Sequence, residues 1–150
     1  MQIIKDKQIV DDSWHYVADD AELSDGDITV SLARWKQDRA QLLQANGKVG
    51  VRIGPADSVD ELAADLASIA LIELDFPAFA DGRLFSHAWL LRGRYHYQGE
   101  IRATGQFMAD QVYYLSRVGV NAFNLEKSED LPAALSTLDD FSVNYQKSIH

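Results

Sequence analysis

The sequence contains no cysteine, and this absence removes several classes of chemistry. Disulfide bonds, thiol nucleophiles and cysteine-ligated zinc or iron–sulfur sites all need that residue. The four histidines do not replace it, because none of them stands in an HExxH pattern or another metal-ligand spacing. We therefore expect no metal site. A chain without disulfides also fits a cytoplasmic protein.

Long apolar runs and phosphate-binding motifs are missing as well. No stretch approaches the ~18 uninterrupted apolar residues typical of a transmembrane helix. The first residues, MQIIKDKQIVDD, lack the apolar core of a signal peptide. We therefore expect a cytoplasmic protein with no membrane attachment. The motifs GxGxxG, GxxxxGK[ST] and GxSxG do not occur, so a dinucleotide-dependent enzyme is not supported.

Positive charge is scarce and unevenly placed. The formal net charge of −9 argues against a broad nucleic-acid interface, which needs a basic face. Between Asp75 and Gly119, however, five arginines stand against four acids. An arginine-rich, locally neutral region in an acidic chain suits either a small anion or a self-paired ion network.

The 150 residues predict a single α/β domain with an accessory N-terminal β and loop section over residues 1–27. Strands are expected at 28–30, 49–53, 69–74, 99–103 and 120–125. Helices are expected at 32–45, 83–95, 106–118 and 131–138. A further helix is expected to begin at a capping box formed by Ser58 and Glu61. A final extended segment is expected at 141–145. This alternation indicates a mostly parallel sheet of about five strands.

Two architectures satisfy the alternation. We favour a flavodoxin-like or Rossmann-like sheet with helices on both faces, because it encloses its own core at this length. The alternative is a half (β/α) barrel, which would expose its inner face and form a homodimer. Both place ligands at the carboxyl ends of the strands.

The first polar loop after a predicted strand contains Asp75, Asp81, Gly82 and Arg83. Asp81, Gly82 and Arg83 lead into a helix, whose free backbone N–H groups favour anions. Arg83 could add a bidentate contact to sulfite, phosphate or a carboxylate. The structural alternative is that Gly82 makes a turn, Asp81 caps the helix and Arg83 pairs with Asp81 or Asp75.

A second candidate group follows at Arg102, Thr104 and Gly105. Arg102 is expected at the end of its strand beside Asp75, as a ligand contact or as half of a buried pair. Asp110 and Arg117 share one face of the next helix. They could bind a partner, although a plain salt bridge is the simpler interpretation.

Aromatic residues crowd the same part of the chain. Most must belong to the core, and an excess beyond that need would form an interface patch. The nine residues are Phe76, Phe79, Phe85, Trp89, Tyr95, Tyr97, Phe107, Tyr113 and Tyr114.

The segments DFPAFADGR, FSHAWLLRGR, GEIRATG and DQVYYLSRVGVNAF resemble a bacterial family of uncharacterised proteins, domain of unknown function nine-three-four. The resemblance covers nearly the whole chain and is sharpest over residues 76–123. Members are typically encoded beside the haemoprotein subunit of assimilatory sulfite reductase, and some are labelled oxidoreductases. The resemblance therefore implies an accessory protein of sulfite reduction that docks on the sulfite reductase haemoprotein.

The resemblance leaves a second function open. The chain would then be a small oxidoreductase or electron-transfer component that binds a sulfur oxyanion or a flavin-like cofactor at Asp81, Arg83 and Arg102. The residues themselves predict no cofactor, and the non-catalytic role is the one we expect.

Overall fold

The computed structural model describes residues 2–77, 82–107 and 109–138, which contain one mixed sheet of eight strands. Five parallel strands form its centre: β4 (Ile28–Ser31), β5 (Val49–Ile53), β6 (Leu71–Phe76), β7 (Glu100–Gly105) and β8 (Ala122–Leu125). The hairpin of β1 (Gln2–Lys5) and β2 (Gln8–Asp11) extends the sheet antiparallel beyond β8. The short β3 (His15–Tyr16) pairs with β4 at the other edge. The chain is α/β, as predicted.

Helical segments fill the connections between the parallel strands. After β4 come α1 (Leu32–Gln37) and α2 (Arg39–Leu43), and after β5 the 3-10 helix η1 (Val59–Ser68). After β6 come α3 (Gly82–Trp89) and a π-helical extension, η2 (Leu90–Arg94), and after β7 come η3 (Ala109–Gln111) and α4 (Val112–Arg117). The short η4 (Ser128–Asp130) and a helix over residues 131–138 follow β8.

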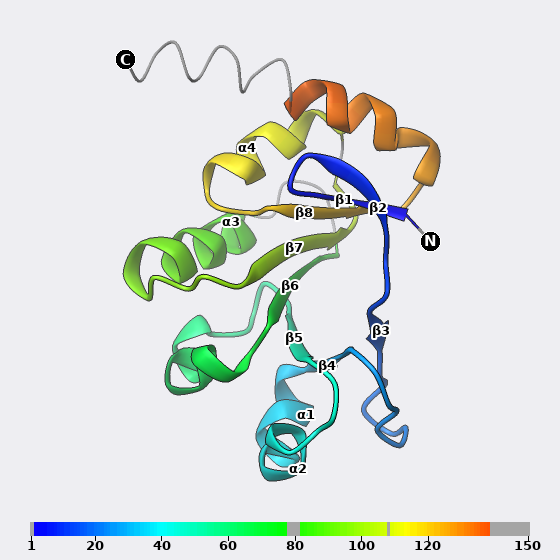
Figure 1. The fold of residues 1–150 in the computed structure, drawn as a ribbon. Helices are drawn as coiled ribbons and strands as arrows, with labels where there is room; N and C mark the ends of the chain where they lie inside the picture. The colour runs from blue at the N-terminus through cyan, green and yellow to red at the C-terminus, as the bar shows by residue number, and fades with distance from the viewer. Residues whose placement is uncertain (1, 78–81, 108, 139–150) are drawn as a thin grey trace.

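The strand order corrects the favoured architecture. The five parallel strands lie in the sheet in the order of the sequence, from β4 to β8. Parallel crossovers are right-handed, so an order that never reverses places every crossover helix on one face. Figure 1 shows α1, α2, α3 and α4 along one side of the sheet. A flavodoxin-like sheet needs a reversal to cover both faces, so the half-barrel alternative fits instead.

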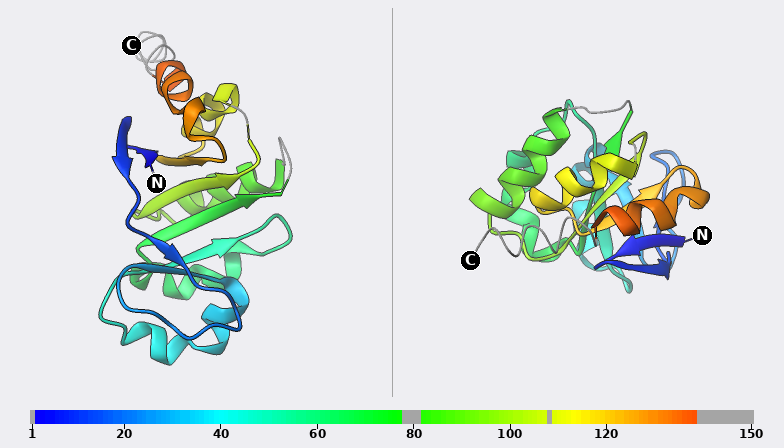
Figure 2. Two further views of the ribbon diagram at one scale, coloured as in Figure 1. Left: turned by 90° about the vertical axis from the view of Figure 1, so that its right-hand side faces the viewer. Right: turned by 90° about the horizontal axis from the view of Figure 1, so that it is seen from above.

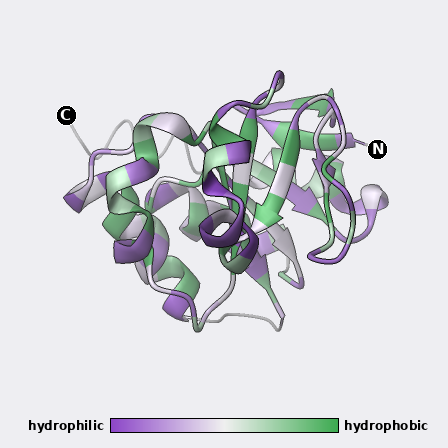
Figure 3. Cartoon of the chain, turned by 90° about the horizontal axis from the view of Figure 1, so that it is seen from below, coloured by the Kyte–Doolittle hydropathy of each residue, from purple (hydrophilic) through white to green (hydrophobic). Residues whose placement is uncertain are grey.

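The face beneath the helices is apolar because alternate strand residues point the same way. Ile53, Leu74, Ala103 and Phe123 share one row across four neighbouring strands, and all of them are buried. Ile4 of the hairpin continues that row. Figure 3 shows strands that carry both hydrophobic and hydrophilic residues, beside helices that also carry hydrophilic residues.

The sheet is strongly curled, and the chain length requires it. β2 and β3 are opposite edges of the sheet, yet only residues 12–14 connect Asp11 to His15. Four Cα steps span at most ~14 Å, whereas eight flat strands would span roughly 34 Å. The two edges must therefore approach one another. We call residues 12–16 the bridge. It descends from β2 and ends in β3 in Figure 1, and it is seen from the side in Figure 2.

Several local predictions differ from the structure. The helix predicted over residues 32–45 breaks at Asp38, whose carboxylate accepts a hydrogen bond from Arg34. The predicted capping box does not form, because the side chain of Ser58 makes no capping hydrogen bond and Glu61 pairs with Lys36. The extended segment predicted at 141–145 lies outside the described residues.

Candidate functional site

The inner face of the curled sheet, opposite the helices, carries charged side chains. The parallel register places Arg52, Glu73 and Arg102 side by side on β5, β6 and β7. Lys5 ends the same row on β1, next to the small Ala122. Opposite charges therefore alternate across three central strands. We call these side chains and the bridge residues that contact them the inner polar network.

Arg102 is the most enclosed member of this network, with 2% of its surface exposed. Its Nε and Nη2 lie 3.0 and 2.8 Å from Oε2 of Glu100. Its Nη1 donates to Asp12 of the bridge at 2.9 Å. Lys5 reaches the other carboxylate oxygen of Glu100 at 3.1 Å. Two cations thus share two carboxylates, and Asp12 holds the bridge to the sheet.

Arg52 makes the second contact with the bridge. Its Nε donates to the buried carboxylate of Glu73 at 2.6 Å, and its guanidinium lies 3.8 Å from the centre of the Tyr16 ring. This geometry is a cation–π contact. Burial raises the pKa of the Tyr16 phenol, while the Arg52 charge opposes that rise.

A polar edge lies at the carboxyl ends of the central strands. Asp75, Thr104 and Asn124 share one row, and Nδ2 of Asn124 donates to Oγ1 of Thr104 at 3.2 Å. Gly105 follows with φ of +97°, and a Cβ there would lie 2.5 Å from the carbonyl oxygen of Phe76. Glycine is therefore required at this turn.

The structure brings only some of the predicted residues together. Asp75, Arg102, Thr104 and Gly105 belong to two adjacent strands. Arg102 does not end its strand, however, because β7 continues to Gly105. The register therefore pairs Arg102 with Glu73 and pairs Asp75 with Thr104.

The other predicted residues belong to the helical connections. Gly82 and Arg83 are exposed at the start of α3, and Asp81 lies outside the described residues. Asp110 is exposed in η3. Arg117 is exposed in α4, where its Nη1 donates to the Tyr113 hydroxyl at 3.2 Å.

The sequence-based prediction found only Arg102 of the inner polar network. The members that were not among the candidates are Lys5, Asp12, Tyr16, Arg52, Glu73 and Glu100. A signal did exist, because VGVRI, LIELDF and EIRATG each place a charged residue inside an apolar strand. A charged residue at an inward position of a buried strand needs a partner, and three neighbouring strands supply such residues here.

Two hollows adjoin these elements. One of about 240 Å³ lies beside Arg102 and is lined also by Lys5, Asp12, Ser13 and Trp14. A larger one of about 410 Å³ lies at the amino ends of β6 and β7.

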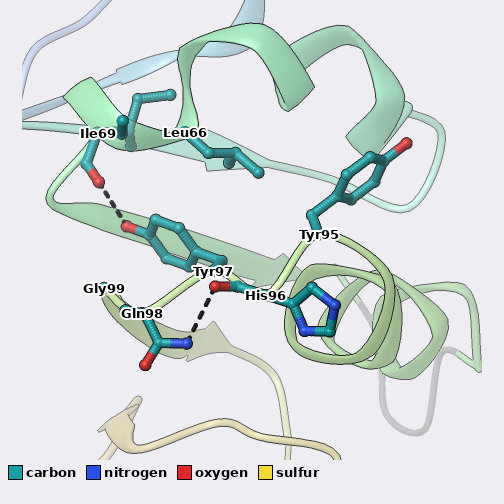
Figure 4. Close-up of a pocket in the computed structure, with 8 residues that line it drawn as sticks. Leu66, Ile69, Tyr95, His96, Tyr97, Gln98 and Gly99 are labelled. Carbon is teal, nitrogen blue, oxygen red and sulfur yellow. Dashed lines mark hydrogen bonds between the residues drawn. The ribbon is translucent and has the colours of Figure 1, made fainter.

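Figure 4 shows the larger hollow, with Leu66 and Ile69 opposite the ring of Tyr97. The Tyr97 hydroxyl donates to the Ile69 carbonyl at 2.7 Å, which ties the loop before β7 to the residues before β6. Within the described part of the chain, no cluster of three or more acidic or histidine side chains could hold a metal ion. No helix there is long and apolar enough to cross a membrane.

Residues 50–150 match the family model described as "Bacterial protein of unknown function (DUF934)". The chain therefore belongs to the DUF934 family. The match begins at β5, so four of the central parallel strands and most of the inner polar network lie inside the family region. The hairpin and the bridge of this DUF934 protein precede it. No curated protein matches the chain.

Proposed function

We propose that this DUF934 protein is a non-catalytic accessory protein of assimilatory sulfite reduction that docks on the sulfite reductase haemoprotein. The reaction context comes from the sequence resemblance. The structural observation that favours docking over small-molecule chemistry is the pairing of the inner arginines. Arg102 donates to Glu100 and Asp12, and Arg52 donates to Glu73.

This pairing gives the inner arginines a structural task. A small oxyanion at Arg102 would compete with Asp12 for the guanidinium and would lie close to the carboxylate of Glu100. Removing one partner from a buried ion pair typically costs about 3–5 kcal/mol, which weak anion binding does not offset. The network therefore supports a role in holding the bridge to the sheet, and leaves partner binding to the outer surfaces.

The test is recovery of the haemoprotein with the tagged protein from cells grown on sulfate as the only sulfur source. Absorbance of the eluate detects haem, and mass spectrometry identifies the protein that carries it. A tagged, unrelated protein of similar acidity is the matched control. Enrichment of the haemoprotein over that control supports the proposal, and equal recovery from both baits contradicts it.

One observation supports a second candidate function, an oxidoreductase or electron-transfer component that binds a sulfur oxyanion. A guanidinium has five N–H donors, and Arg102 directs three of them to Glu100 and Asp12 while lining the 240 Å³ hollow. Calorimetric titration of the purified protein with sodium sulfite tests this role. Binding that Lys5→Met weakens would favour it, because Lys5 also lines the hollow.

A further inference from the structure

Two large aromatic side chains stand on the outside of neighbouring helices. Trp89 on α3 and Tyr114 on α4 are each 61% exposed, the two highest values among the exposed large hydrophobic residues of the described chain. The aromatic residues of this region differ in burial. Phe76, Tyr97 and Phe107 are buried, Phe85, Tyr95 and Tyr113 are half-buried, and only Trp89 and Tyr114 among the described ones face solvent. Exposed aromatic side chains of this size are typical of interaction surfaces.

A specific contact aligns the two helices. Nε of Arg92, in the π-helical extension of α3, donates to the carbonyl of Gly119 just after α4 at 3.0 Å. Trp89 lies three residues before Arg92, and Tyr114 lies five residues before Gly119. Both residues are therefore within about one and a half helical turns of the same contact.

The side of α3 that carries Trp89 is also known. Nε2 of His87 lies 3.2 Å from the carbonyl oxygen of Gly54, so that side of the helix faces the loop after β5. Two residues advance an α-helix by about 200°. Trp89 therefore points away from β5, towards the solvent side that borders α4. The two aromatic residues belong to one surface, which we call the α3–α4 face.

The α3–α4 face is basic although the chain is acidic. The helical segments α3, η2, η3 and α4 contain four arginines and one acid, Asp110, in a chain of formal charge −9. Arg92 donates to the carbonyl oxygens of Tyr97, Gly99 and Gly119, which are neutral. Arg94 is exposed, with its guanidinium 5.6 Å from the centre of the Tyr95 ring.

Tryptophan, tyrosine and arginine are the residues that most often dominate the binding energy of protein interfaces. We propose that the α3–α4 face docks an acidic surface of the sulfite reductase haemoprotein, with Trp89 and Tyr114 as its anchors and the arginines as its electrostatic guide. This inference rests on the proposed function and assigns its interface. An acidic partner follows from charge complementarity with the basic face.

The experiment measures the affinity of the purified haemoprotein for the wild type and for Trp89→Ala, Tyr114→Ala and Leu43→Ala. Leu43 is the matched control, a 43% exposed apolar residue of α2. Each aromatic variant should weaken binding by about tenfold or more, the effect of removing an interface anchor. Leu43→Ala should stay within about twofold. Thermal unfolding of all four proteins checks that the exposed substitutions preserve the fold.

A charge-reversal variant tests whether the partner surface is acidic. Arg94→Glu should weaken binding strongly at low ionic strength and less at high salt, because salt screens exposed charges. If Arg94→Glu strengthens binding, the occupant is not acidic and the proposal is wrong.

The remaining outcomes separate the two proposals. If the wild type binds and both aromatic variants bind equally well, the interface is overturned while the accessory function stands. If the wild type does not bind, the proposed function fails and the interface fails with it. Sedimentation that shows a dimer lost in Trp89→Ala would assign the face to a second copy of the chain and overturn the proposal.

Discussion

Nη1 of Arg102 lies 2.9 Å from the carboxylate of Asp12, although ninety positions separate the two residues in sequence. The contact joins the bridge to the inner face of the curled sheet. The same carboxylate also accepts the backbone N–H of Trp14 at 3.0 Å, so it fixes the direction of the bridge as well. Through this pair, the edge strands β2 and β3 are held to the middle of the sheet.

Asp12→Asn should therefore destabilise the protein. The substitution removes the charge that faces Arg102 and leaves only Glu100 to compensate a nearly buried guanidinium. We expect a loss of about 1–3 kcal/mol in the free energy of unfolding, measured by urea denaturation. Asp20→Asn, in an exposed turn, is the control and should change stability by less than about 0.5 kcal/mol. Equal stability of the two variants would show that the bridge contact is unimportant.

Glu73 offers a second test of the inner polar network. It is 3% exposed and accepts from Arg52, whereas Glu61 pairs with Lys36 at a half-exposed position. Glu73→Gln should cost about 1–3 kcal/mol, and Glu61→Gln no more than about 0.5 kcal/mol. Urea denaturation of both variants measures the difference. A double substitution, Arg52→Leu with Glu73→Leu, should cost less than the sum of the single changes, because it leaves no uncompensated charge.

Both the backbone conformation and the packing at position 119 require glycine. Its φ is +108°, and a Cβ would lie 2.2 Å from Cγ of Arg92. Gly26 has a similar φ of +92° with nothing within 4 Å of the added atom. Gly26→Ala should thus cost only the left-handed backbone conformation, about 1 kcal/mol. Gly119→Ala should cost at least 1–2 kcal/mol more, since Arg92 must move. Thermal unfolding compares them, and equal losses would mean that Arg92 yields freely.

The local elements were largely predictable because they depend on short-range patterns. The strands expected at 49–53 and 69–74 correspond to β5 and β6, the β section expected within residues 1–27 contains the hairpin, and the helix expected at 106–118 ends within one residue of α4. The order of the strands was not predictable in this way. Periodicity shows that a strand is buried but not which strand lies next to it, so the flavodoxin-like sheet and the half-barrel satisfied the same pattern.

The candidate site shows the same limit. The strand that contains Arg102 was predicted to end at residue 103 and its neighbour at residue 74, each two residues early, and Arg102 was expected beside Asp75, two residues beyond its observed partner Glu73. A shift of two keeps a side chain on the same face and moves it by one row. The prediction therefore placed Arg102 on the correct face of the sheet but beside the wrong residue, because Glu73 is its partner on the neighbouring strand. Asp12 could not be inferred, because its contact depends on the curl of the whole sheet.

The alkaline stability of the fold should depend on Tyr97. Its phenol is buried, donates to the Ile69 carbonyl and has a pKa raised well above the usual value, chiefly by burial and further by the Glu100 charge. Above about pH 10, the tyrosine of the unfolded chain loses its proton, while the folded protein retains it. The unfolded state then binds fewer protons, so stability falls as pH rises. Below about pH 10 both states keep the proton, and the stabilising contribution is complete.

Tyr97→Phe should separate the two effects of this hydroxyl. Near neutral pH the variant should lose about 1 kcal/mol with the hydrogen bond to Ile69. Between about pH 9 and 11 its stability should fall less steeply than that of the wild type, because no buried phenol remains to ionise on unfolding. Urea denaturation over this range gives both quantities. Tyr114→Phe controls for the removal of a tyrosine from an exposed site. A slope unchanged by Tyr97→Phe would assign the alkaline loss to other groups.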